Sequence, residues 1–147
     1  MATLNRVLDV AAPVTVAFTA WADLKHYPRF MEGVTRVEAM GPSRWRFRGD
    51  IGFGEETWEV GLLDAVPDLM LSWESTSVRH TAMSIQFSAL GLGRTRLSVS
   101  FSFDPHAVMQ SDPEAFMTAR LDRILERYRK VVEGDVAGAA ERSPAPP

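Results

Sequence analysis

Two charged residues fall at positions where the hydrophobic pattern of the chain predicts burial, and these two could do chemistry. Glu56 lies on the same face of a predicted strand as Trp58, and Arg120 lies within the apolar stripe of a predicted C-terminal helix. A lone charge in an apolar interior is costly, so each side chain must reach water, a partner or a ligand. One interpretation makes both residues polar anchors in a hydrophobic pocket, a composition typical of small-molecule sites. In the other, Arg120 extends to solvent along the helix and Glu56 lies at a hydrated hairpin end.

The other reactive residue types form no catalytic or metal-binding pattern. His26, His80 and His106 are widely separated and lack the spacing of metal ligands. The sequence has no cysteine, which excludes disulfides, zinc-thiolate sites and a thiol nucleophile. It contains neither a G-x-S-x-G nucleophile elbow nor a glycine-rich phosphate loop. We therefore expect no metal and no cofactor, and Glu56 and Arg120 remain the only catalytic candidates.

The overall composition is that of one ordinary globular domain. The chain has 147 residues, of which 46% are hydrophobic and 24% charged, and a net charge of −3. No run of like charge marks a nucleic-acid partner, and no apolar stretch is long enough to predict membrane insertion. The N-terminus lacks the pattern of a signal peptide. We expect a cytoplasmic protein that is a monomer or a homodimer.

The periodicity predicts a strand, two short helices, six more strands and one long helix. The first strand is expected at Leu4–Val10, followed by a helix from Pro13 to about Asp23 and a short turn near His26–Met31. Alternating patterns then predict strands at Val34–Met40, Arg44–Ile51, Glu55–Asp64, Leu69–Ser75, His80–Leu90 and Thr95–Phe103. Because the connections between these strands are short, the sheet should be antiparallel.

The last predicted helix closes the domain. Ser111 and Glu114 have the spacing of a capping box at its start, and Gly134 is expected to end it after about Glu133. Residues 1–134 would then form the domain. The Ala/Pro-rich tail at 135–147 is expected to be disordered.

This order of elements predicts an α+β fold with a curved seven-stranded antiparallel sheet wrapped around the long C-terminal helix. Seven strands span about 30 Å and a helix only about 10 Å, so one helix cannot cover a flat sheet of that width. The sheet must curl around the helix, and the enclosed space can exceed what side chains fill. A cavity between the sheet and the helix is therefore expected.

Alternation also assigns the residues that face this cavity. Pairing Trp45 with Trp58 places the β-hairpin arginines beside glutamates on the outer face. Leu69 is expected to point inward with the rest of its strand. The predicted ligand-binding set is Trp45, Phe47, Glu56, Trp58, Trp73, Met83, Ile85, Phe87, Val99, Phe101, Met117, Arg120, Leu121 and Ile124. Aromatic and aliphatic stripes of this kind also form solid cores, so the pattern alone fits either a core or a pocket.

The segment 21–34 has the spacing W-x-D-x-x-x-Y-P-x-F-M-x-x-V and resembles the opening of the polyketide cyclase/dehydrase-like family of the START-like (helix-grip) superfamily. The stretches 58–60, 66–73 and 95–97 are also similar to it, and the resemblance covers about residues 3–133. It implies the helix-grip fold and a cavity that holds lipids, isoprenoid quinones, polyketides or hormones. Trp21, Tyr27 and Phe30 would pack the short helices against the sheet as part of the scaffold.

Three functions follow from these observations. The leading hypothesis is binding of a hydrophobic small molecule, such as a lipid, an isoprenoid quinone or a polyketide-like aromatic. The alternative is a polyketide cyclase, aromatase or dehydratase that uses Glu56 or Arg120, with Tyr27 or Tyr128 as helpers and Arg120 stabilising an enolate. A third is a protein-interaction role with an unused pocket. No sequence signature of the cyclases is present to decide among them.

Overall fold

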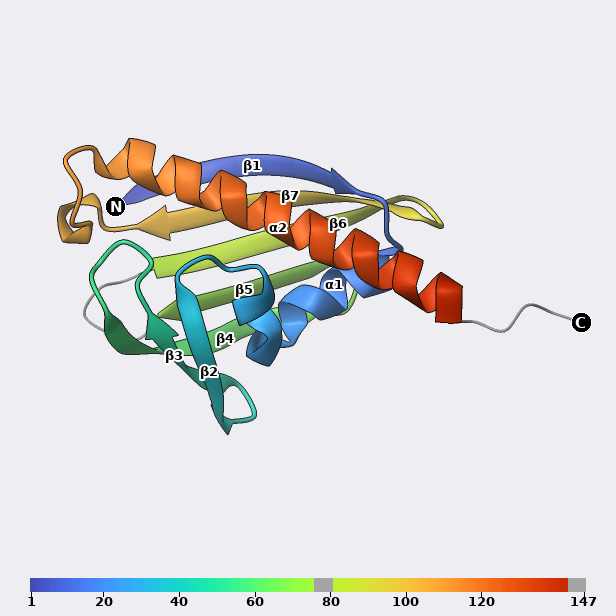
Figure 1. Cartoon of the computed structure of the whole chain (residues 1–147), viewed down its shortest axis with the longest axis horizontal. Helices are drawn as coiled ribbons and strands as arrows, with labels where there is room; N and C mark the ends of the chain where they lie inside the picture. The colour runs from blue at the N-terminus through green and yellow to red at the C-terminus, as the bar shows by residue number, and fades with distance from the viewer. Residues whose placement is uncertain (76–80, 143–147) are drawn as a thin grey trace, which may run out of the picture.

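The computed structural model describes residues 1–75 and 81–142, and Figure 1 shows their arrangement. The elements, in chain order, are β1 (Ala2–Val10), α1 (Val14–Ala22), the 3-10 helix η1 (Leu24–Arg29), β2 (Val34–Gly41), β3 (Arg44–Gly49), β4 (Glu56–Val66), β5 (Met70–Ser75), β6 (Thr81–Gly91), β7 (Arg94–Phe103), the 3-10 turn η2 (Pro105–Ala107) and α2 (Pro113–Arg142). This is the predicted order, with η2 added. The predicted start of β6 at His80 lies outside the described residues.

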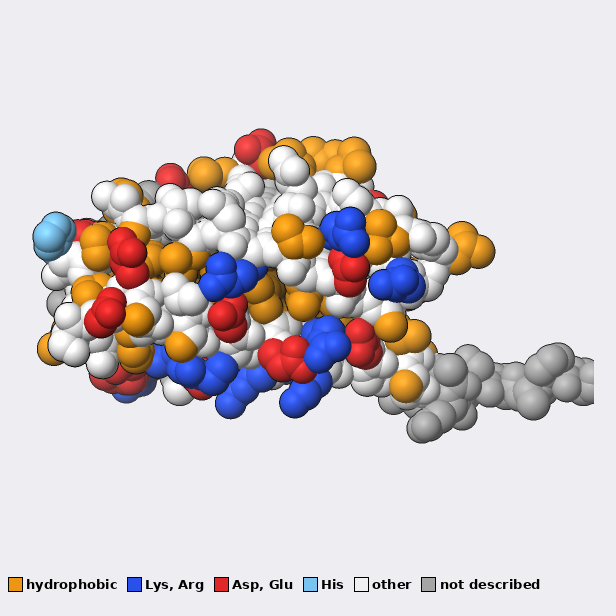
Figure 2. Space-filling model, turned by 90° about the horizontal axis from the view of Figure 1, so that it is seen from above, with side chains coloured by type: hydrophobic (Ala, Val, Ile, Leu, Met, Phe, Trp, Pro, Cys, Tyr) orange, Lys and Arg blue, Asp and Glu red, His pale blue; other side chains and the backbone are white. Residues whose placement is uncertain are grey.

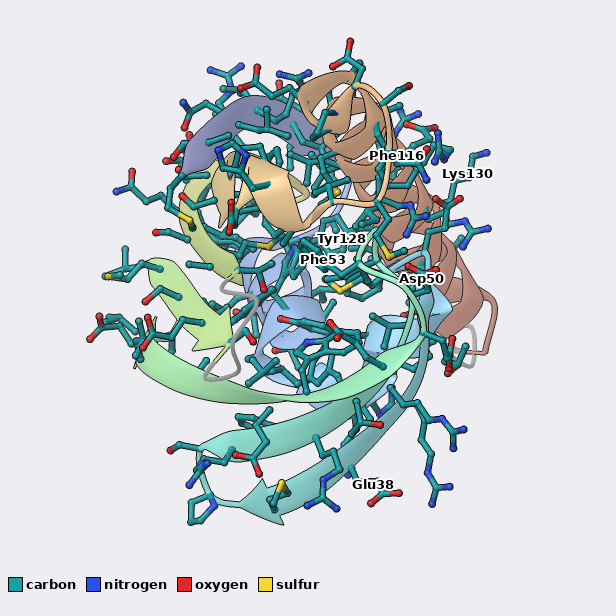
Figure 3. The ribbon with its side chains drawn as sticks, turned by 90° about the vertical axis from the view of Figure 1, so that its left-hand side faces the viewer. Glu38, Asp50, Phe53, Phe116, Tyr128 and Lys130 are labelled. Carbon is teal, nitrogen blue, oxygen red and sulfur yellow. The ribbon has the colours of Figure 1, made fainter. Side chains whose placement is uncertain are left out.

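All seven strands form one antiparallel sheet in the order β1-β7-β6-β5-β4-β3-β2. The sheet curves, and α2 runs along its concave side, while α1 and η1 lie on the same side farther along (Figure 1). Figure 3 looks along the molecule from the end at which β3 and β4 are connected and shows the sheet curving beneath the helices. The predicted α+β architecture is therefore confirmed.

The inward faces pack into one continuous core. Phe47, Trp58 and Trp73 from the central strands are buried, as are their partners on β6, β7 and α2. Inside this core, the Trp21 ring lies 5.0 Å from the Phe30 ring and 5.0 Å from the Tyr128 ring. Aromatic pairs at this spacing add to the stability that burial provides. These rings join α1, η1 and α2, as expected for scaffold residues.

The predicted pairing of Trp45 with Trp58 is wrong by two residues. Phe47 lies opposite Trp58, and Trp45 lies opposite Val60. The shift arises because β3 ends at Gly49, two residues earlier than predicted, and the chain then turns inward before β4 begins. The predicted outer ion pairs still form, between Arg44 and Glu59 and, at 3.7 Å, between Arg48 and Glu55, because long arginine side chains reach along the face.

Leu69 does not point inward: it is 61% exposed. β5 begins one residue later, at Met70, and Leu69 belongs to the turn before it. Asp68 in this turn has a φ of +66° and accepts a hydrogen bond from the Thr15 hydroxyl at 3.0 Å. The turn geometry therefore overrides the alternating pattern at this position.

The start of α2 differs from the predicted capping box. The Asp112 carboxylate accepts a hydrogen bond from the Ala115 amide at 3.2 Å, and the helix starts at Pro113. Asp112 therefore caps the helix in place of Ser111. An aspartate at this position satisfies an amide that has no partner within the helix.

The prediction that Gly134 ends the helix is also wrong, because α2 continues to Arg142. Ala137 and Ala139 favour helix, and an ion pair of 2.8 Å between Arg29 and Asp135 holds this stretch against η1. The predicted disordered tail is thus helical as far as Arg142, and residues 143–147 lie outside the described part of the chain.

Replacing Gly134 with alanine tests the helical continuation. A methyl group at this exposed position meets no atom within 4 Å, so the free energy of unfolding should rise by about 1 kcal/mol. A helix that ended here in a left-handed conformation would instead lose stability. Urea denaturation measures the difference. Gly49→Ala is the opposite control, because its added carbon would lie 1.8 Å from the Gly33 carbonyl oxygen, and it should lower stability.

No helix in the described residues is both long and apolar enough to span a membrane.

Candidate ligand-binding site

A small apolar cavity lies between the sheet and α2. It is lined by Met31, Ile51, Trp73, Met83, Phe101, Met117, Arg120, Leu121 and Ile124. Its volume is about 20 Å³, roughly enough for a single water molecule. A cavity therefore lies between the sheet and the helix, as the sequence predicts, but side chains fill nearly all of the space there.

The connection between β3 and β4, residues 50–55, covers one end of this cavity; we call it the mouth segment. Ile51 and Phe53 turn inward and are 8% and 2% exposed. Gly52 and Gly54 adopt φ values of +124° and +87°, which strongly favour glycine. The Asp50 carboxylate accepts hydrogen bonds from the amides of both glycines, at 2.9 and 3.1 Å. This backbone geometry directs the two apolar side chains into the interior.

A second, open hollow lies on the outer side of the mouth segment. It has a volume of about 360 Å³ and is lined by Asp50, Gly52, Gly54, Met109, Gln110, Phe116 and Arg120. Asp50, Gly52 and Gly54 thus border the hollow, Ile51 borders the cavity, and Arg120 borders both. In Figure 3, which views this end of the molecule, Phe53 lies toward the interior and Asp50 lies beside α2.

Arg120 connects α2 to the mouth segment and to the turn before β2. Its Nη1 donates hydrogen bonds to the backbone carbonyls of Glu32, at 3.2 Å, and Asp50, at 3.1 Å. Its Nε lies 2.6 Å from the Glu32 carboxylate, an ion-pair contact whose angle is not that of a hydrogen bond. The guanidinium also lies over the Phe116 ring, 5.1 Å from its centroid. The charge of Arg120 is therefore paired with that of Glu32, and its Nη1 donates to the protein backbone.

Glu32 holds two arginines at once. Its carboxylate accepts hydrogen bonds from Arg123, the shortest at 2.9 Å, in addition to the contact with Arg120. The hydrogen bond from Arg123, with a smaller contribution from the charge of Arg120, lowers the pKa of Glu32 below its usual value. Glu32 is consequently ionised at neutral pH.

The predicted site residues divide into two groups. Seven of the fourteen line the cavity: Trp73, Met83, Phe101, Met117, Arg120, Leu121 and Ile124. Phe47, Trp58, Ile85, Phe87 and Val99 are buried in other parts of the core, and Trp45 is only partly buried. The role of the set in binding stays a prediction.

Glu56 lies away from the cavity lining. It is the first residue of β4, half-buried and opposite Gly49. The structure therefore does not bring Glu56 and Arg120 together around the cavity. Glu56 thus lies at the end of the hairpin formed by β3 and β4.

Sequence reasoning did not place Met31 and Ile51 in the lining. Both lie outside regular strands and helices, where alternation carries no information. The cluster of Gly49, Gly52 and Gly54 is a signal that could have indicated a special backbone conformation between β3 and β4.

Tyr27 and Tyr128 contribute to the scaffold rather than to the cavity. Their hydroxyls donate hydrogen bonds to the carbonyls of Trp21, at 2.7 Å, and Ala17, at 2.8 Å. Burial raises the pKa of both phenols. Neither lines the cavity, so a role as a proton donor to a ligand has no geometric support.

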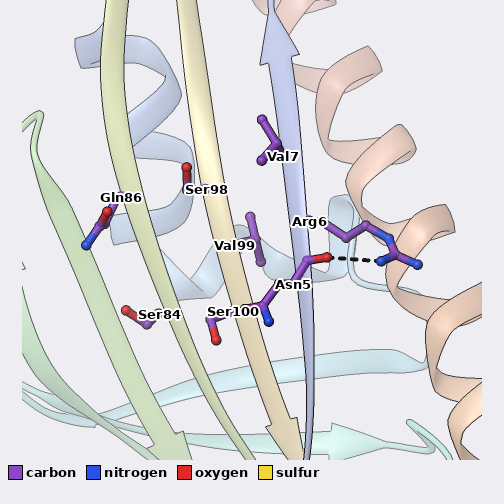
Figure 4. A pocket seen from close by; sticks show the side chains of 8 residues that line it. All are labelled: Asn5, Arg6, Val7, Ser84, Gln86, Ser98, Val99 and Ser100. Carbon is purple, nitrogen blue, oxygen red and sulfur yellow. Dashed lines mark hydrogen bonds between the residues drawn. The ribbon is translucent and has the colours of Figure 1, made fainter.

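Two other features of the described residues do not mark a site. No group of three histidine or carboxylate side chains within residues 1–75 and 81–142 could hold a metal ion. A hollow of about 340 Å³ on the outer face of β6, β7 and β1 is shallow and lined mainly by short neutral side chains such as Ser84, Ser98 and Ser100 (Figure 4). Arg6 at its border is already bonded to Asp122 at 2.6 Å.

Comparison with known proteins places the chain in a family. The model for polyketide cyclase/dehydrase and lipid transport proteins matches residues 1–133. The chain belongs to the polyketide cyclase/dehydrase and lipid transport family. The resemblance seen in the sequence is therefore confirmed.

Solved structures with low sequence identity to this chain share its fold. A START superfamily protein from Mycobacterium smegmatis superposes with a TM-score of 0.72 at 16% identity, over 93% of this chain and 98% of that one. The Zhui aromatase/cyclase from a Streptomyces species superposes with a TM-score of 0.61 at 19% identity, over 96% of this chain and 94% of that one. An uncharacterized 17.2 kDa protein of Streptomyces lincolnensis is 22% identical over 90% of this chain and 91% of its own.

Proposed function

We propose that this member of the polyketide cyclase/dehydrase and lipid transport family binds a hydrophobic small molecule between the sheet and α2. The observation that carries the proposal is the arrangement at the mouth segment. Of the two inward side chains of the segment, Ile51 borders the cavity, and its neighbours Asp50 and Gly52 border the open hollow. A modest movement of one short segment would therefore join the two spaces.

The joined space has the size of a ligand site. Pockets for small molecules have volumes of about 300–1,000 Å³, and the open hollow alone provides about 360 Å³. Met31, Met83 and Met117 form part of the inner wall. Methionine is flexible and polarizable, so a wall rich in it can repack around an entering molecule.

Binding is favoured over catalysis because of Arg120. The alternative is a cyclase, by analogy with the Zhui aromatase/cyclase, which has a similar fold. Such an enzyme needs a polar group that can contact the substrate. Arg120 is the charged residue in the cavity lining, and its guanidinium is already bonded to Glu32 and Asp50. A binding protein requires no such group.

Filling the cavity should block uptake. Met83 is 2% exposed and lies opposite Trp73 and Phe101 in the sheet, so Met83→Phe places a bulkier, more rigid side chain in the inner wall. Overpacking a core costs about 1–3 kcal/mol, and we expect affinity for an environment-sensitive hydrophobic dye to fall at least about tenfold. Native mass spectrometry and dye titration measure stoichiometry and affinity.

The matched control is Met40→Phe, which makes the same change at a residue that is 44% exposed on β2. It should bind one dye molecule with the affinity of the wild type. If both variants bind as the wild type does, the interior is not the site. If the wild type binds no hydrophobic probe at all, the proposed function is wrong.

A further inference from the structure

The candidate site contains a charge, and that charge is already paired within the protein. Arg120, with its side chain 14% exposed, is paired with Glu32, and Glu32 is shared with Arg123. Both donor contacts of its Nη1 end on backbone carbonyls. Figure 2 shows acidic and basic side chains side by side over part of one face of the molecule, with several Lys and Arg side chains along its lower edge.

A second observation disfavours an anion at the same place. The Asp50 carboxylate borders the open hollow and carries negative charge on the route to the cavity. It accepts hydrogen bonds from Gly52 and Gly54, and these bonds hold it in position. A ligand carboxylate would meet this charge at the hollow and would compete with the Glu32 carboxylate for Arg120. Burying it unpaired in the apolar cavity would be more costly still.

We propose, resting on the proposed function, that the ligand is uncharged, with an apolar body in the cavity and a neutral polar end in the hollow. A hydroxyl group at that end can donate a hydrogen bond to the Asp50 carboxylate, and a hydroxyl or carbonyl oxygen can accept one from the Gln110 amide. Both residues line the hollow. Alcohols, esters and neutral carbonyl compounds fit this description, and free fatty acids do not.

The test compares two probes with the same chain, decanol and decanoate, at neutral pH, where the acid is ionised. Wild-type protein should bind decanol at least about tenfold more tightly, because one uncompensated charge disfavours the acid by more than the 1.4 kcal/mol that a factor of ten represents. Displacement of a bound hydrophobic dye measures both affinities under identical conditions.

Glu32→Gln sharpens the test by exposing the charge of Arg120 while keeping a side chain of the same shape. The preference for decanol should fall by at least about tenfold in this variant. Glu126→Gln is the control, because Glu126 pairs with Arg129 outside the site, and it should keep the wild-type preference.

The outcomes separate this inference from the proposed function. If the wild type binds decanoate as tightly as decanol, the ligand class is wrong and the binding function stands. If Glu32→Gln folds but keeps the full preference for decanol, the compensated Arg120 charge is not its cause, and the inference fails. If neither probe displaces the dye and native mass spectrometry shows no bound apolar molecule, the proposed function fails as well.

Discussion

Replacing Trp21 with alanine is expected to lower the free energy of unfolding by about 3–5 kcal/mol, the usual cost of removing a large buried aromatic side chain. Trp21 is fully buried, and its ring contacts those of Tyr27, Phe30 and Tyr128. Through these rings it joins the two short helices to α2. A domain of this size has a total stability of about 5–15 kcal/mol, so much of it would be lost. Guanidinium denaturation followed by circular dichroism measures the change.

Trp45→Ala is the matched control for this substitution. Trp45 is only partly buried on β3, so removing it deletes fewer packed contacts and should cost about 1–2 kcal/mol. A loss for Trp21→Ala no greater than that for Trp45→Ala would contradict the assignment of the aromatic cluster as the principal link between these helices.

Replacing Arg120 with methionine is expected to open the site rather than weaken binding. The substitution removes the hydrogen bonds to the carbonyls of Glu32 and Asp50 and the ion pair with Glu32. The lost hydrogen bond to the Asp50 carbonyl is worth about 1 kcal/mol, so the mouth segment should detach more often, and the association rate of a hydrophobic probe should rise about fivefold. Stopped-flow fluorescence measures the rate, and amide hydrogen exchange of residues 51–54 should accelerate in parallel.

The direction of this effect distinguishes two roles for Arg120. An arginine that held the ligand, as the cyclase alternative requires, would lower affinity when replaced and leave exchange in the mouth segment unchanged. Arg129→Met is the control, because Arg129 pairs with Glu126 on the outer face of α2 and should affect neither quantity.

Low pH should weaken the ion pairs that Glu32 makes with Arg120 and Arg123. The folded-state pKa of Glu32 lies below its ordinary value, so the stability from these ion pairs is present above pH 4.5, the ordinary pKa of the residue. It is lost as the pH falls through the lowered folded-state pKa. Glu32→Gln should therefore show a smaller loss of stability across that acidic range than the wild type.

The fold could be predicted from the sequence because its strands have strict alternation. Met83 and Phe101 point inward as expected, since a period of two fixes which face of the sheet a residue occupies. Alternation does not fix the register between strands. The partner of Trp58 on β3 is Phe47 instead of Trp45, a shift of two residues. A shift by two leaves the side chains of β3 on their predicted faces.

The candidate site was harder to predict because it depends on backbone geometry and on distant contacts. Arg120 was recognised as a charge in an apolar stripe, but its partners Glu32 and Asp50 lie in connections that carry no periodic pattern. The inward turn of Ile51 follows from the positive φ of its neighbour Gly52, at which an added Cβ would lie 2.9 Å from the Phe116 ring. The width of the sheet predicts an enclosed space between sheet and helix, and the structure has one. The width does not reveal that bulky side chains fill nearly all of that space.

Methyl-labelled methionine NMR tests the central claim most directly. Met31, Met83 and Met117 line the cavity, whereas Met1 and Met40 are exposed on the surface. On titration with decanol, binding in the cavity should produce cross-relaxation between the ligand chain and all three cavity methyl groups, and none to Met1 or Met40. Cross-relaxation confined to exposed methionines, or no perturbation of the three cavity methyl groups at saturation, would contradict a ligand site between the sheet and α2.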